Sequence, residues 1–309
     1  MHPIFILLFF AILVVALTVI YYPRSVDVVS AANPATEKTD YRNFYEDSYA
    51  PADQIIDPKI ESSYNLRDVP AKAPAQPDSR AVDIKEFVQR YSLQDKRVLE
   101  VGAGSGKFQD IVEDYTGSDI SSTAKRLFHK RFVACSSTSM PFPDSEFDAL
   151  WTIAVLEHVP KPEQALSEMR RVLKNGGLLY LSPAWQCRSW HADGYDVRPY
   201  GDFDIKGKLI KASVPLRDSV VFRSLYTFPI RFLRLTAWKF NGRPTSFRYN
   251  AITPNYQHYW ESDSDAVNSM DPYEAILWFN SRGDKCLNYN GSVSQFFVRT
   301  DAIIIRIQK

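Results

Sequence analysis

The most constraining feature of this chain is a glycine-rich turn, VLEVGAGSG from Val98 to Gly106, followed thirteen residues later by Asp119. The apolar residues and one acid before the turn predict a buried parallel strand over 98–101. Glycines leave no Cβ in the way of an approaching ligand. We expect a helix over about 107–115 with free N–H groups facing that ligand, and Asp119 at the tip of the next strand, where it can accept both hydroxyls of a ribose. The spacing therefore predicts a nucleotide-shaped pocket on an α/β sheet.

The form of the turn separates two kinds of pocket. Dinucleotide-binding proteins usually carry GxGxxG, and this chain carries GxGxG, so a nicotinamide-dependent oxidoreductase is the weaker alternative. With Glu100 two positions before the first glycine, the turn resembles motif I of class I S-adenosylmethionine-dependent methyltransferases. The resemblance implies S-adenosyl-L-methionine as the cofactor. It also implies the cofactor-binding residues, which are Glu100, Gly102, Ala103, Gly104, Gly106, Asp119, Ile120, Ser136 and Ser137.

One position departs from that family. Where the family commonly has an aspartate before an MPFP turn, to accept a hydrogen bond from the adenine amino group, this chain has Ser136 in ACSSTSMPF. A serine hydroxyl can accept that bond but carries no charge. The resemblance therefore leaves the identity of the cofactor unchanged and predicts an adenine contact that is either weaker or made by a backbone carbonyl instead.

The resemblance continues from Met140 to Pro183, in the branch that includes many small-molecule methyltransferases. This segment predicts a buried strand in FDALWTIAVL and a helix in KPEQALSEMRRVLK with a left-handed exit at Gly176 and Gly177, followed by a strand in LLYLS. The helix carries one apolar stripe, at Ala165, Leu166, Met169, Val172 and Leu173. The implied fold is α/β, a Rossmann-like, doubly wound, seven-stranded sheet with a terminal β-hairpin.

The N-terminus predicts a membrane anchor. Residues 3–22, PIFILLFFAILVVALTVIYY, contain no charge, and twenty helical residues at ~1.5 Å each match a hydrocarbon core about 30 Å thick. A cleaved signal peptide is the alternative, with a small-residue site at VVSAA, although only His2 precedes the apolar stretch. Arg24, Lys38 and Arg42 follow the span, so the positive-inside rule predicts a single-pass membrane protein with its catalytic domain in the cytoplasm.

The rest of the chain divides around this core. We expect a transmembrane anchor at 1–22, a partly disordered tether at 23–80, the cofactor-binding core at 81–183, an α-rich substrate-side insertion at 184–270, and completion of the core sheet at 271–309. The tether contains an aromatic cluster that either covers the cofactor pocket or, as the simpler interpretation, only packs on the domain. Its members are Tyr41, Phe44, Tyr45 and Tyr49, with Ile55 and Ile56 close behind.

Composition excludes several classes of protein. Lys and Arg total 37 against 36 Asp and Glu, so no nucleic-acid partner is expected. Three widely spaced cysteines without a CxxC pair predict neither a disulfide framework nor a metal site, and favour a reducing compartment. The oligomeric state is not predicted.

The insertion contains a basic, aromatic region over 219–260, with six Lys or Arg, eleven aromatic residues and no Asp or Glu. A helix after Pro229 places Ile230, Phe232, Leu233, Ala237 and Phe240 on one side and Arg231, Arg234 and Lys239 on the other. One interpretation is a helix at 220–240 that lies in a membrane surface or captures an anionic, lipid-linked acceptor. The other is a helix whose apolar side packs on the catalytic core. In both, the guanidinium groups suit a phosphate or carboxylate on the substrate.

Methyl transfer from a sulfonium is an in-line displacement, so catalysis comes largely from alignment of the acceptor atom. If a hydroxyl accepts the methyl group, its proton must leave, and the candidates are Glu157 and His158 in LEHV and His191 in WHADGYD. Structural roles at a strand end and in a loop are the alternatives for the two histidines. The predicted function is methyl transfer to a small-molecule or lipid-linked acceptor at the cytoplasmic membrane face. A non-catalytic binding or scaffold protein with the same fold is the alternative.

Overall fold

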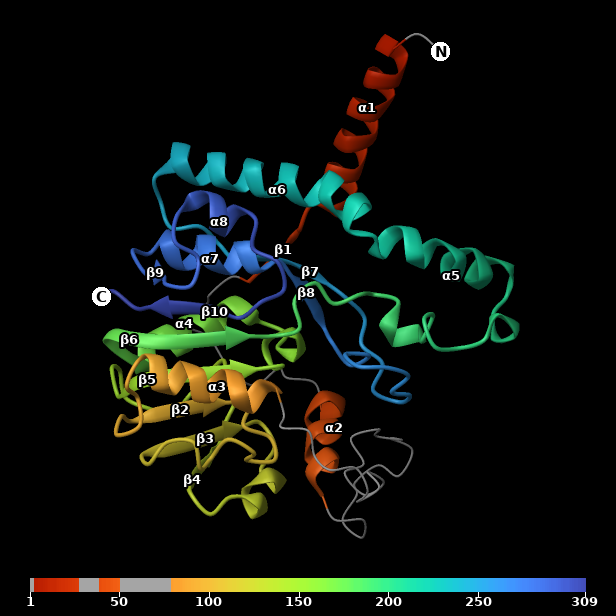
Figure 1. The fold of residues 1–309 in the computed structure, drawn as a ribbon. Helices are drawn as coiled ribbons and strands as arrows, with labels where there is room; N and C mark the ends of the chain where they lie inside the picture. The colour runs from red at the N-terminus through yellow and green to blue at the C-terminus, as the bar shows by residue number, and fades with distance from the viewer. Residues whose placement is uncertain (1–2, 28–38, 51–78) are drawn as a thin grey trace.

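A computed structural model of the protein describes residues 3–27, 39–50 and 79–309, and its centre is a seven-stranded sheet (Figure 1). The strand order is β4-β3-β2-β5-β6-β10-β9, in which β10 runs antiparallel to both neighbours and the first five strands are parallel. This is the predicted Rossmann-like sheet. The strands are β2 (Val98–Val101), β3 (Tyr115–Asp119), β4 (Arg131–Ala134), β5 (Phe147–Ile153), β6 (Leu173–Ser182), β9 (Lys285–Cys286) and β10 (Ile303–Arg306).

Helices cover both faces of the sheet, as a doubly wound fold requires. α3 (Ser79–Arg90) packs on one face through Ile84, Phe87 and Val88. α4 (Pro162–Val172) and α7 (Pro272–Asn280) pack on the other. The predicted stripe of α4 is fully buried, and each large apolar side chain in it contributes about 1.5–3 kcal/mol to folding. These two apolar layers fix the position of the strand ends.

Two local predictions about the core were wrong. No helix forms over 107–115; these residues form turns, and Tyr115 already begins β3. α4 ends at Val172, and β6 begins at the next residue, so the expected helix end at Lys174 and Asn175 lies inside a strand. In the first case, β3 begins at the end of the segment. In the second, the parallel pairing of β6 with β5, which joins Leu173 to Phe147, extends the strand to the end of the helix.

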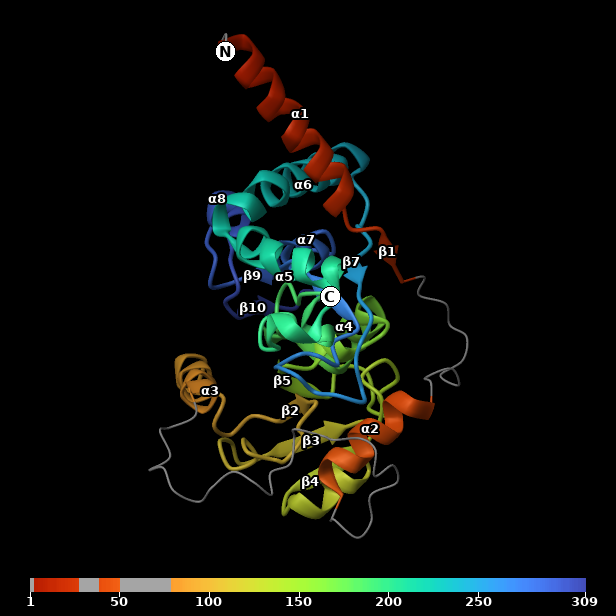
Figure 2. The same cartoon turned by 90° about the vertical axis from the view of Figure 1, so that its right-hand side faces the viewer.

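Within the described residues, the N-terminal region contains two helices and a short strand. α1 (Pro3–Tyr21) extends away from the body, β1 (Ser25–Val26) pairs with β7, and α2 (Thr39–Tyr49) lies beside β3 and β4 at the opposite end of the molecule (Figures 1 and 2). α1 is long and apolar enough to cross a membrane. Four predictions fall outside the described residues: the remainder of the tether, the VVSAA site, the charge of Lys38, and the contacts of Ile55 and Ile56.

The insertion contains two helices and most of a second, three-stranded sheet. α6 (Val220–Asn241) lies at the foot of α1, α5 (Ile205–Asp218) leads into it, and the short α8 (Ser292–Phe296) lies beside α7 (Figure 1). The sheet has the order β1-β7-β8, where β7 is Arg248–Ala251 and β8 is Asn268–Met270.

α6 contradicts the interpretation in which its apolar side packs on the core. Arg231 and Arg234 are buried, at 3% and 6% exposed, as is Ile230 of the apolar side at 8%, whereas Phe232 and Phe240 are 59% and 90% exposed. Each arginine is held by a carboxylate of the Asp271–Glu274 segment. The helix therefore turns these two arginines inward, although Lys239 on the same side is exposed, and the two guanidinium groups are already occupied by the protein, contrary to the predicted substrate contact.

Candidate functional site

A cavity of about 200 Å³ lies at the carboxyl ends of β2, β3 and β5. Ligands of open α/β sheets bind at this edge, because the connections there diverge. Six of the predicted site residues line the cavity: Gly102, Asp119, Ile120, Ser136, Ser137 and His158.

Close contacts within the protein require glycine in this turn, in addition to the space that glycine leaves for a ligand. Gly102 has a φ of +72°, and a Cβ there would lie 2.1 Å from a methyl carbon of Val155. A Cβ on Gly104 would lie 2.8 Å from the hydroxyl of Tyr49. Gly102 therefore has to be glycine for two reasons, a left-handed backbone and the close approach of Val155.

Asp119 ties the turn to the next strand. One carboxylate oxygen accepts the N–H of Gly104 at 2.9 Å, and the other accepts the N–H of Ser121 at 3.0 Å. Burial raises the pKa of Asp119, and these hydrogen bonds oppose that rise. A carboxylate fixed in this way has a second lone pair on each oxygen for a ligand hydroxyl.

Glu100 lies differently. Its carboxylate accepts the hydroxyl of Tyr115 at 2.5 Å, and burial raises its pKa to about 8. Glu100 is not among the residues that line the cavity, and neither are Ala103, Gly104 and Gly106. The contacts of these four residues with a cofactor stay predictions. Glu100 and Gly104 already form hydrogen bonds within the protein, with Tyr115 and Asp119.

α2 forms one wall of the cavity. Tyr41, Tyr45 and Tyr49 line it, so the aromatic cluster does more than pack on the domain. Glu46 fastens the helix: its carboxylate accepts the N–H groups of Ser122 and Thr123, each at 2.9 Å. Burial acts against the charge of Glu46, but these and two hydroxyl hydrogen bonds outweigh it and lower its pKa.

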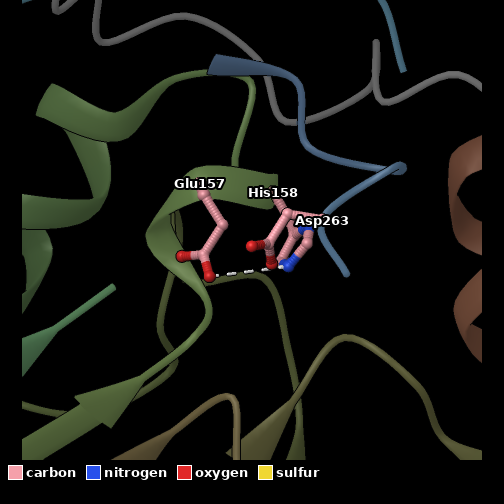
Figure 3. Close-up of side chains that lie close together, drawn as sticks. All are labelled: Glu157, His158 and Asp263. Atoms are coloured by element: carbon pink, nitrogen blue, oxygen red, sulfur yellow. Dashed lines mark ion pairs between the residues drawn. The ribbon is translucent and has the colours of Figure 1, made fainter. Parts of the chain in front are cut away.

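A group of acids surrounds His158 on the wall beyond β5. Glu157 and His158 come from the 3₁₀ turn Leu156–His158, and Asp263 approaches from the segment before β8 (Figure 3). The Nδ1 atom of His158 lies 3.1 Å from Asp265, and its Nε2 atom lies 3.7 Å from Glu157. We call Glu157, His158, Asp263 and Asp265 the acid–histidine cluster. Tyr45 of α2 donates a hydrogen bond to Asp265 at 2.7 Å, which joins the cluster to the cavity wall.

The electrostatics of the cluster favour a charged imidazole. Burial alone would lower the pKa of His158, but Asp265, Glu157 and Asp263 outweigh it and raise the value to about 9. Burial would raise the pKa of Asp265, and His158 and Tyr45 lower it. At neutral pH the structure therefore holds an imidazolium against an ionised Asp265. Candidate ligand atoms of Glu157, His158 and Asp263 lie within 4.8 Å of one another, a spacing that also suits one bound cation.

His191 belongs to a different group. Its Nε2 atom lies 3.7 Å from both Asp196 and Glu261, and burial lowers its pKa. It does not line the cavity. The hydroxyl of Ser264 donates to the carbonyl of His191 at 3.1 Å, so its loop supports the segment that carries the acids of the cluster. The contact uses the main-chain carbonyl, so the role of the His191 side chain stays a prediction.

Sequence reasoning missed Asp263 and Asp265, and it named Tyr45 as a possible cover of the pocket but not as a partner of Asp265. The signal for the two acids was the acidic run ESDSDA, directly after a region with no acid at all. Asp263 also has a φ of +64°, an uncommon backbone conformation that concentrates at functional sites.

Comparisons with known proteins agree on the core. Residues 99–181 match a protein-family model described as a methyltransferase domain. The chain is 35% identical over 96 residues to a demethylmenaquinone methyltransferase of Renibacterium salmoninarum, covering 28% of this chain and 40% of that protein. It is 30% identical over 137 residues to phthiotriol/phenolphthiotriol dimycocerosates methyltransferase 1 of Mycobacterium ulcerans, covering 38% and 51%.

A solved structure matches over a similar extent. It is an S-adenosylmethionine-bound amino pentose methyltransferase of Micromonospora echinaspora, 19% identical, with 37% of this chain and 53% of that chain covered and a TM-score of 0.33. The chain spans about half the length, or less, of the curated relatives named above. What the comparisons identify is one segment of the chain: residues 99–181 match the methyltransferase domain family.

Proposed function

We propose that this protein transfers a methyl group from S-adenosyl-L-methionine to a small-molecule or lipid-linked acceptor at the cytoplasmic face of a membrane. The observation that carries the proposal is one cavity with two walls, the buried Asp119 carboxylate on one side and His158 of the acid–histidine cluster on the other. Two named relatives act on demethylmenaquinone and on phthiotriol or phenolphthiotriol lipids, which favours an apolar acceptor.

The residues that would hold the cofactor are those at the strand ends. Asp119 would accept the ribose hydroxyls, and Gly102 and Ile120 would bound the sugar and base. Ser136 and Ser137 lie where the adenine would be bound, with a hydroxyl in place of the family's carboxylate. The bound cofactor would supply an electrophilic methyl group, and the chain would align the acceptor behind it.

The acid–histidine cluster would take the proton that the acceptor loses in those molecules in which His158 is neutral, because the imidazolium that prevails at neutral pH has no free nitrogen lone pair. His158 is the member that lines the cavity, and Asp265 holds its Nδ1 side, so Nε2 is left to exchange protons. With a pKa of about 9, the imidazole accepts a proton in a growing fraction of molecules as the pH rises toward that value. Glu157, buried beside Nε2, would stabilise the imidazolium that forms. His191 would act only on the loop that positions these groups.

Membrane attachment would bring the cavity to its acceptor. α1 offers a span, and Arg24 and Arg42 follow it with the positive charge expected on the cytoplasmic side. The outward side of α6 exposes Phe232, Leu233 and Phe240, which suits a helix that lies in the membrane interface next to α1.

The test is calorimetric titration of the full chain, in a mild detergent, with S-adenosylmethionine and its demethylated product. We expect binding that Asp119→Ala weakens by at least about 100-fold, since two hydrogen bonds to a charged group are lost at about 1.5–3 kcal/mol each. Asp110→Ala removes an exposed carboxylate and should leave binding unchanged. Asp119 also ties down Gly104, so thermal unfolding must show that the variant is folded.

The alternative is a scaffold that keeps the fold without catalysis, for which the uncharged Ser136 is the supporting observation. A folded wild-type chain that binds neither form of the cofactor would establish this alternative. Binding of both forms would justify a search of membrane extracts for the methyl acceptor, with a labelled methyl group.

A further inference from the structure

A second cavity, of about 290 Å³, lies at the foot of α1. Its walls come from the end of α1, the first half of α6, the end of α5, and the β7 and β8 strands. It shares no lining residue with the cofactor cavity. In Figures 1 and 2 this region lies at the end of the molecule away from α2. The cavity is therefore a separate site and not an extension of the methyl-transfer site.

The cavity is basic. Five arginines and two carboxylates line it, and both carboxylates are already bound: Asp271 to Arg231 and Glu274 to Arg234, which lies behind the wall. Arg188 pairs with Asp218 outside the cavity. Within the described part of the chain, no carboxylate forms an ion pair with the remaining three arginines, Arg217, Arg223 and Arg248.

Those three arginines are held by aromatic groups and carbonyls. The Arg217 guanidinium lies 4.3 Å from the ring centre of Trp190. Arg248 lies 5.6 Å from the ring of Tyr22 and donates to the carbonyl of Pro23 at 3.4 Å. Arg223 lies beside Tyr226, and burial together with Arg188 lowers its pKa. Like charges that share one cavity repel each other, and a bound anion relieves that repulsion.

The setting matches the surface of a membrane. Tyr21, the last residue of α1, stacks on Tyr226 of α6 with ring centres 4.2 Å apart, and aromatic residues concentrate where a span leaves the hydrocarbon. Ile20 lines the cavity and is 65% exposed, and Val221 near Arg223 is 76% exposed. A ligand in this cavity thus has guanidinium groups on one side and the apolar surface of α1 on the other.

We propose that this cavity binds the phosphate headgroup of an anionic membrane phospholipid. Guanidinium groups bind phosphate in two-point contacts, and three that form no ion pair within the described part of the chain line this cavity. The acyl chains would run along the exposed apolar side of α1. This inference rests on the membrane anchoring in the proposed function but not on methyl transfer.

The experiment uses the full chain in lipid nanodiscs of phosphatidylcholine, with and without phosphatidylglycerol. Native mass spectrometry after release into mild detergent counts the lipids that stay bound. We expect one retained phosphatidylglycerol on the wild-type chain. Because each lost charged hydrogen bond costs about tenfold in affinity, Arg217→Gln/Arg223→Gln should reduce retention by about 100-fold. Arg243→Gln removes an exposed arginine of the same region and should retain lipid like the wild type.

Three results would overturn the inference: equal retention of both lipids by the wild type, unchanged retention by the double variant, or equal loss in Arg243→Gln. Thermal stabilisation by inorganic phosphate to the same extent as by phosphatidylglycerol would also overturn it, because the site would then recognise a free anion. If the double variant does not fold, Arg223→Lys keeps the charge without the two-point contact and should lose part of the retention.

Cofactor titration of the same samples separates this inference from the proposed function. Lipid retention without cofactor binding supports the lipid site and contradicts methyl transfer. Cofactor binding by a chain that does not enter nanodiscs contradicts the anchor and the lipid site together and leaves methyl transfer standing.

Discussion

Two buried ionic groups of this protein are built on opposite plans. On α6, each arginine meets one carboxylate: Arg231 lies 2.7 Å from Asp271, and Arg234 lies 2.8 Å from Glu274. Around His158, by contrast, three carboxylates face a single imidazole at longer range, 3.1 Å and 3.7 Å to the nearest two. Charge is balanced in the first group and is not balanced in the second.

The difference in charge balance indicates different roles for the two groups. A balanced, two-point pair satisfies its own hydrogen bonds and leaves nothing for a ligand. In an unbalanced group the charges change one another's pKa, and such groups concentrate at active sites. Burial raises the pKa of Glu157, while three acids raise that of His158 to about 9. The α6 pairs therefore orient a helix, whereas the acid–histidine cluster is where the proposed proton exchange would take place.

The largest expected effect is on the balanced group. Arg234→Met leaves the Glu274 carboxylate buried without its partner, and breaking a buried pair in this way costs about 3–5 kcal/mol. Chemical denaturation of the full chain in detergent should show a free energy of unfolding lower by that amount. The double variant Arg234→Met/Glu274→Met should recover most of the loss, because it buries no unpaired charge.

Arg243→Met is the matched control, since Arg243 is exposed, and it should change the free energy of unfolding by less than about 0.5 kcal/mol. A cost for Arg234→Met no greater than that of the control would mean that the α6 pair is not a structural element. The α6 pairs and the acid–histidine cluster would then not differ in their contribution to stability.

The second prediction concerns the unbalanced group. Of the three acids, Asp265 raises the pKa of His158 the most. Asp265→Asn removes this charge, so the pKa of His158 should fall from about 9 toward its ordinary value. An opposite charge at this distance shifts a pKa by about one unit or more, and one unit corresponds to about 1.4 kcal/mol. NMR titration of labelled histidine side chains, with His158→Gln to assign the signal, measures the change without a known acceptor.

The control for that titration is Asp110→Asn, an exposed acid beside His129. It should leave the His158 signal unmoved. Titration of the wild-type His158 near 6.5 would show that the three acids do not act on it, and the proposed proton exchange would lose its basis.

The sequence predicted the parts of the fold and the site that depend on short stretches of chain. The turn at Gly102, the strand-end Asp119 and the buried stripe of α4 are local patterns, and each is where it was expected. The partners of His158 are not local: Asp265 lies 107 positions away and Tyr45 lies 220 positions from Asp265. No period or spacing connects such residues, so only the fold could bring them together.

The prediction of how α6 is oriented was wrong for a related reason. Amphipathic periodicity shows that a helix has two sides, but it does not show which side meets the protein. Arg231 and Arg234 turn inward because Asp271 and Glu274, forty residues further on, are placed by α7 to receive them. The exposed Phe232 and Phe240 then follow from the geometry of the helix.

The smallest expected effect tests a third arrangement, in which one carboxylate is balanced by neutral donors. Glu46 accepts four hydrogen bonds from Ser121, Ser122 and Thr123, and these fasten α2 over the cofactor cavity. Glu46→Gln keeps the shape of the side chain but removes its charge, which weakens these hydrogen bonds by about 1 kcal/mol in total. If α2 closes the cavity, cofactor affinity should therefore fall about fivefold. Calorimetric titration with the demethylated cofactor measures this, and Asp83→Asn on α3, away from the cavity, is the control. Unchanged affinity in Glu46→Gln would mean that α2 covers the cavity without contributing to binding, and the three arrangements would reduce to the two compared above.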